Sequence, residues 1–219
     1  MGDFMATGNQ EYQSQLRQLA ELVLAVAGES VTVMKRSAPE RALKLKRQDE
    51  WGIYLEFLKV MFNLTDRLSA LYLPVKDQPQ FMDSLEDAVT LQLKNVLEPA
   101  FGSGADQIEI MLTVGTAVAE SRQTYERFRF LVTEDSPVKE EMLKAFGGRV
   151  ADAMGIAENA QISSAATLCA SAVIPAIKAI LAGDLPTVAA VGTEVPVVTH
   201  TPSASPPPTA TPGPQGPTG

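Results

Sequence analysis

The side chains that most often carry chemistry are scarce in this chain. Its 219 residues include one histidine, His200, and one cysteine, Cys169. A nucleophilic serine or cysteine needs a neighbouring base, most often histidine, and zinc sites combine several cysteine and histidine ligands. His200 lies in a proline-rich segment, away from the apolar sequence. We therefore expect no catalytic residue, no metal, no cofactor and no enzymatic activity.

Acidic residues leave one alternative open. Glu134-Asp135 and Glu140-Glu141 cluster around a predicted helix start. Carboxylates alone can bind Mg²⁺, so an enzyme with acid-only metal chemistry is the last-ranked hypothesis. The favoured interpretation is that these charges complement the positive end of the helix dipole.

One basic cluster stands out from an acidic chain. The total charge is −8, but residues 35–47 carry +5, so the remaining residues carry −13. The cluster consists of Lys35, Arg36, Arg41, Lys44, Lys46 and Arg47. The favoured interpretation is a solvated helix surface paired with the acidic remainder of the chain. As a candidate binding site, the cluster would contact an acidic partner protein, with nucleic acid or an anionic surface as a weaker alternative. Arg41, Lys44 and Lys46 do not share one helix face, which argues against docking in a nucleic-acid groove.

A narrow polar line interrupts an otherwise apolar helix predicted over 40–72. Glu56, Lys59, Asn63, Asp66 and Arg67 form this line. Because unpaired polar groups are costly to bury, Asn63, Asp66 and Arg67 are a candidate buried polar node, with Asn63 and Arg67 one helical turn apart. The same helix carries Trp51, Tyr54 and Phe57, and an alternative function is a small-molecule-binding domain with a pocket between helices lined by these residues or their neighbours.

Apolar periodicity predicts helices and no convincing strand pair. The fold expected is all-α: a bundle of about six mostly antiparallel helices with short links. The predicted helices span 11–27, 40–72, 79–97, about 106–131, 137–155 and 162–181, and the domain spans 9–184 after a flexible N-terminus, 1–8. Between the first two, residues 30–34 have some strand character.

Several residues predict where these helices begin and end. Gly28 is expected to stop or kink the first helix, and Ser37 with Glu40 resembles a capping box for the second. Pro99 and Gly102-Ser103-Gly104 should end the third. Ser136-Pro137 should begin the fifth, and Pro175 should kink the last helix or shift its start.

The C-terminal segment differs in composition from the rest. Nine of the fifteen prolines lie from Pro186 onward, and Glu194 is the single charged residue there. Such a segment buries too little apolar surface to offset its ordering entropy. We predict a disordered Pro/Thr/Ser-rich tail over 185–219.

One uncharged stretch, 159–177, is long enough to cross a membrane. Alanine and serine dominate it, so we expect a buried helix instead and no membrane span. The sequence shows no export signal, and we expect a cytoplasmic protein with Cys169 reduced. The leading functional hypothesis is a non-catalytic interaction or scaffold module that binds another protein or itself.

Overall fold

The computed structural model describes residues 12–101 and 107–184, without the side chains of 98–101 and 107. The chain divides into two units, Met1–Leu185 and Pro186–Gly219, and every described helix belongs to the first. The predictions for 1–8, 185–219 and the glycine turn at 102–104 lie outside the described residues.

Seven α-helices and no strand make up the described residues, which confirms the all-α fold class. They are α2 (Gln13–Ser37), α3 (Pro39–Ala42), α4 (Arg47–Tyr72), α5 (Gln78–Phe101), α6 (Gln107–Tyr125), α7 (Pro137–Ala153) and α8 (Ala160–Ala182).

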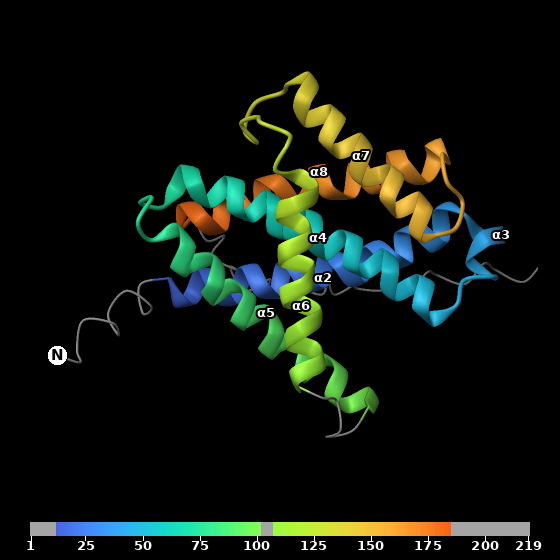
Figure 1. Ribbon diagram of the computed structural model, residues 1–219, viewed down its shortest axis with the longest axis horizontal. Coiled ribbons are helices and arrows are strands. Elements are labelled where there is room, and N and C mark those ends of the chain that lie inside the picture. The colour runs from blue at the N-terminus through green and yellow to red at the C-terminus, as the bar shows by residue number, and fades with distance from the viewer. Residues whose placement is uncertain (1–11, 102–106, 185–219) are drawn as a thin grey trace, which may run out of the picture. The chain divides into compact units, whose positions relative to one another are not determined.

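Helix α4 lies at the centre of the first unit. It packs against α2, α5, α6, α7 and α8 (Figure 1). A helix that is apolar on most of its circumference can be buried on several sides, and α4 has thirteen buried residues, including Phe57, Phe62 and Leu68. This confirms the prediction of a central helix and explains why its polar line needs partners within the protein.

Helix α2 runs straight through the predicted stop. It is continuous from Gln13 to Ser37, so the expected end at Gly28 and the strand character of 30–34 are both wrong. A glycine costs a helix interior only about 1 kcal/mol relative to alanine. Ala27, Ser30 and Met34 are buried at helical spacing, and this packing outweighs the cost.

The second predicted helix is divided. Residues 39–42 form the short α3, and α4 begins only at Arg47. Ser37 does not cap: its hydroxyl donates to the carbonyl oxygen of Val33 within α2, at 3.0 Å. The start of α4 is instead marked by Asp49, whose carboxylate accepts from the Lys46 backbone N–H at 2.9 Å.

The ends of α5 and α6 also differ from the prediction. Helix α5 continues to Phe101, past Pro99, because proline disfavours but does not forbid a helix interior. Helix α6 ends at Tyr125 instead of near residue 131. The carbonyl oxygens of Tyr125 and Phe128 both accept hydrogen bonds from Arg67 on α4, which supports a turn here.

The starts of the last two helices follow from their capping residues. The Ser136 hydroxyl accepts from the Lys139 backbone N–H at 3.2 Å, with Pro137 in the first turn, as predicted. The Asn159 side chain accepts from the Ile162 backbone N–H at 3.0 Å. Helix α8 therefore begins well before Pro175, which lies inside it.

Helix α8 is the one described helix that is long and apolar enough to cross a membrane by length and composition. It buries one face, along Ile162, Ala166, Ala170, Val173, Ile177 and Leu181. The expectation of a buried alanine-rich helix thus holds for this face only, because Leu168 on the other face is exposed.

Candidate functional site

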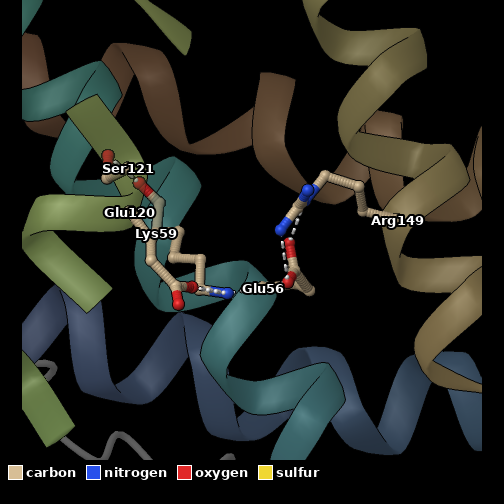
Figure 2. A network of polar contacts seen from close by, with 5 residues as sticks. All are labelled: Glu56, Lys59, Glu120, Ser121 and Arg149. Carbon is tan, nitrogen blue, oxygen red and sulfur yellow. Dashed lines mark hydrogen bonds and ion pairs between the residues drawn. The ribbon is translucent and has the colours of Figure 1, made fainter. Parts of the chain in front are cut away.

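The most completely built polar site joins three helices. Glu56 and Lys59 on α4 are 8% and 7% exposed. Arg149 on α7 donates two hydrogen bonds to the Glu56 carboxylate, from Nε to Oε2 at 2.7 Å and from Nη2 to Oε1 at 3.1 Å. Lys59 Nζ lies 2.9 Å from Glu56 Oε1 and 2.5 Å from Glu120 Oε2 on α6. Figure 2 shows Arg149 directed at the Glu56 carboxylate on one side of α4, and Lys59 and Glu120 on the other.

Backbone contact reinforces this network. The Ser121 hydroxyl on α6 donates to the backbone carbonyl oxygen of Lys59 at 2.7 Å. A side-chain donor to a helix carbonyl ties α6 to the backbone of α4 as well as to its side chains. We call Glu56, Lys59, Glu120, Ser121 and Arg149 the three-helix network.

The pairing in this network shifts the pKa values of its members. Burial alone would raise the pKa of Glu56, but hydrogen bonds from Arg149 and Lys59 outweigh it and lower the pKa below the usual 4.5. Burial would likewise lower the pKa of Lys59, and its bonds to Glu120 and Glu56 raise it above 10.5. Both groups therefore stay charged near neutral pH. This is typical of a structural ion pair, whereas a group that transfers protons has a pKa near the working pH.

The predicted polar node lies nearer the C-terminal end of α4. Arg67 Nε donates to Asn63 Oδ1 at 2.8 Å, and its Nη2 donates to the carbonyl oxygens of Tyr125 and Phe128 at 2.9 and 2.7 Å. The guanidinium also lies 4.5 Å from the ring centre of Phe130. Asn63 and Arg67 are thus brought together, and they hold the turn after α6.

Asp66 is directed to a different neighbour. Its backbone carbonyl oxygen accepts from Gln78 Nε2 at the start of α5, at 3.1 Å. Its carboxylate still contributes electrostatically, because it opposes the burial that lowers the pKa of Arg67. The three predicted residues therefore connect α4 to two different elements.

The structure separates the six residues of the basic cluster into two groups. Lys35 pairs with Glu50 on α4 at 2.5 Å, and Arg41 donates to the Met154 carbonyl oxygen after α7. These two are half-buried and stabilise the fold. The side chains that remain exposed are those of Arg36, Lys44, Lys46 and Arg47.

The three aromatic residues proposed to line one pocket do not do so. Phe57 is fully buried and packs edge-on against Phe146, with ring centres 5.0 Å apart. Trp51 and Tyr54 stack on each other, also at 5.0 Å. Phe57 therefore points away from the stacked pair, because six residues separate it from Trp51 and place it on a different side of the helix.

Trp51 instead lines an open groove between α4 and α6. The groove has a volume of about 530 Å³. Its apolar lining includes Trp51 and Leu55 from α4 and Ile108, Leu112 and Ala117 from α6. Lys59 and Glu120 of the three-helix network are also lining residues. We call it the α4–α6 groove.

A larger open groove of about 1140 Å³ lies between α7 and α8. Most of its lining surface is apolar, from residues such as Leu168 and Ile174, and hydroxyl-bearing and charged side chains such as Ser164 and Lys178 lie among them. Across residues 12–101 and 107–184 the structure brings together no group of three or more His, Cys, Asp or Glu side chains suited to a metal. Burial raises the pKa of the half-buried Cys169 thiol.

The sequence analysis did not predict which residues pair with Glu56 and Lys59. Arg149 lies 93 residues from Glu56 along the chain, and Glu120 comes from a third helix. A weak signal for Arg149 existed, since it lies between the inward-facing Phe146 and Val150.

Comparison with known proteins finds no matching family model, no matching curated protein and no matching solved structure.

Proposed function

We propose that this chain is a non-catalytic interaction module that binds an amphipathic helix of a partner protein in the α4–α6 groove. The observation that carries the proposal is an apolar groove with a tryptophan in its wall. Tryptophan is enriched, with tyrosine and arginine, among the few residues that carry most of the binding energy in protein interfaces. An amphipathic helix places its apolar side chains in such a groove at intervals of three and four residues.

The distribution of exposed apolar side chains supports the same surface. Ten large apolar side chains are exposed in the described residues, and three of them lie within five residues of one another on α6: Ile108, Met111 and Leu112. Leu112 lines the α4–α6 groove while 62% exposed. Exposed apolar residues gathered beside a groove are typical of a surface that a partner covers.

The charged lining residues of the α4–α6 groove indicate which kind of helix would bind there. Glu109 and Glu120 are acidic lining residues, and Lys59 is the basic one. Because Lys59 and Glu120 are paired with each other, Glu109 gives the lining a net negative charge, which favours a partner with Lys or Arg beside its apolar stripe.

Selection from a library of displayed random peptides tests this proposal without a known partner. The full chain is the target, and Leu112→Lys is the test variant. Leu91→Lys is the matched control, because Leu91 on α5 is 60% exposed and is not a lining residue of the groove.

We expect enriched peptides with an apolar helical repeat and basic flanks. Leu112→Lys should weaken their binding at least about tenfold, since it removes an anchor, whereas Leu91→Lys should change it less than about twofold. No enrichment, or equal binding by the Leu112→Lys variant, would contradict the proposal.

A further inference from the structure

The turn between α3 and α4 presents an exposed apolar side chain with cationic residues next to it in the chain. Leu43 is 90% exposed, more than any other large apolar residue that the structure describes. Lys44 and Lys46 on either side of Leu45 are exposed, while Leu45 itself packs against the core. Arg36 is exposed at the nearby end of α2. We call residues 43–46 the basic turn.

Contacts on both sides hold the basic turn in place. Arg41, just before it, donates to the carbonyl oxygen of Met154, and its guanidinium fills the space where a side chain at Gly155 would begin. After it, Asp49 accepts from the Lys46 backbone N–H. Lys35 on α2 and Glu50 on α4 form an ion pair across the two helix ends. The turn is therefore ordered before it meets a partner, and binding need not order its backbone.

Charge is concentrated at this end of the unit. Figure 1 shows α3 where α2 ends and α4 begins, so Arg36, Lys44 and Lys46 share one end. Glu40 is an exposed acidic residue among them, and Arg47 adds a further exposed cation. Residues 35–47 carry a net charge of +5 in a chain of net charge −8.

We infer that the basic turn is a contact site for an anionic lipid surface, with Leu43 entering the interface and Arg36, Lys44 and Lys46 meeting the headgroups. An anionic bilayer offers an apolar layer directly beneath its negative charges. This arrangement matches an exposed leucine with cationic residues next to it in the chain. A nucleic acid would supply the negative charge but no apolar layer for Leu43. Long lysine side chains can reach the headgroups while the leucine lies deeper.

Flotation of the full chain with vesicles tests the inference. The vesicles are phosphatidylcholine alone, or phosphatidylcholine with about 30% phosphatidylserine. The test variants are Leu43→Ser, Lys44→Gln and Lys46→Gln. The double variant Val75→Ser/Lys76→Gln is the matched control, because Val75 is 83% exposed beside an exposed lysine in the turn between α4 and α5.

We expect binding to the phosphatidylserine vesicles only. Each lysine variant should reduce partitioning roughly fivefold, and Leu43→Ser roughly tenfold, while the control variant binds as the unmodified chain does. Raising the salt from about 0.05 M to about 0.5 M should release the protein, because screening shortens the reach of the charges. All of these residues are exposed, and circular dichroism verifies that each variant is folded.

Three outcomes would overturn the inference. They are no binding to phosphatidylserine vesicles at low salt, equal binding to phosphatidylcholine alone, or unchanged binding of the Lys44→Gln and Lys46→Gln variants. Binding of RNA at low salt that ignores Leu43→Ser, together with weak vesicle binding, would assign the basic turn to polynucleotides instead.

Discussion

The buried charged side chains stabilise this fold only when they are paired with one another. Glu56 accepts from Arg149 and Lys59, and Lys59 in turn reaches Glu120. Removing one partner of a buried pair leaves the other charge uncompensated. The energetic role of the three-helix network is therefore clearest when a single member is changed.

Replacing Glu56 with glutamine should destabilise the protein strongly. The amide keeps the shape of the carboxylate but leaves Arg149 without its anion, so we expect a loss of about 3 kcal/mol in the free energy of unfolding. Chemical denaturation measures this loss. Glu120→Gln is the control: its side chain is 45% exposed, so the loss should stay below about 1 kcal/mol. Equal effects of the two variants would contradict the central place given to Glu56.

The lowered pKa of Glu56 also predicts that the difference in stability between the unmodified chain and the Glu56→Gln variant depends on pH. The pKa of Glu56 is lower in the folded state than its usual 4.5, so its stabilising contribution is fully present above that value and is lost as the pH falls through the folded pKa. The stability difference between the unmodified chain and Glu56→Gln should be constant from neutral pH down to about pH 5 and narrow below it. A difference that does not change with acidification would show that Glu56 is not held as a stabilised anion.

Arg67 should be irreplaceable by lysine. Its guanidinium directs three hydrogen bonds, to Asn63 and to two backbone carbonyl oxygens after α6. A lysine ammonium lacks that planar geometry, so Arg67→Lys should lower the free energy of unfolding by about 2 kcal/mol. Hydrogen exchange should show the loss as faster exchange near Tyr125. Unchanged exchange there would mean that the turn does not depend on Arg67.

At the scale of elements, a pair of adjacent glycines offers a sharp comparison. A Cβ at Gly147 would lie 2.5 Å from the Ser163 backbone oxygen on α8, whereas a Cβ at Gly148 would meet nothing within 4 Å. Gly147→Ala should therefore force α7 and α8 apart and lower the melting temperature. Gly148→Ala should raise stability by about 0.5–1 kcal/mol, since alanine favours a helix interior. Similar effects of both would contradict this close approach.

The helices were predictable where local chemistry decides, and less so where tertiary contacts do. Ser136-Pro137 predicts the start of α7, and the apolar circumference predicts the central α4. The continuation of α2 through Gly28 depends on burial of Ser30 and Met34, and the end of α6 on a hydrogen bond from Arg67. Neither contact can be read from local sequence, and the same is true of Arg149 in the three-helix network.

At the scale of the whole molecule, the described core is contained in one unit. All buried apolar residues of the described chain lie between Leu16 and Leu181. Deleting 185–219 should therefore leave helicity and the melting temperature nearly unchanged, as circular dichroism would measure. A large drop in either would mean that this segment contributes to the core.

If an amphipathic helix binds in the α4–α6 groove, as proposed, then Trp51, the one tryptophan of the chain, is placed to report it. Titrating a peptide selected against the full chain should shift Trp51 fluorescence to shorter wavelength as the indole is covered, and the change should saturate. The Leu112→Lys variant should need at least about tenfold more peptide for the same change, and Leu91→Lys should match the unmodified chain. Binding that leaves Trp51 fluorescence unaltered, or that is equal in the Leu112→Lys variant, would contradict the account.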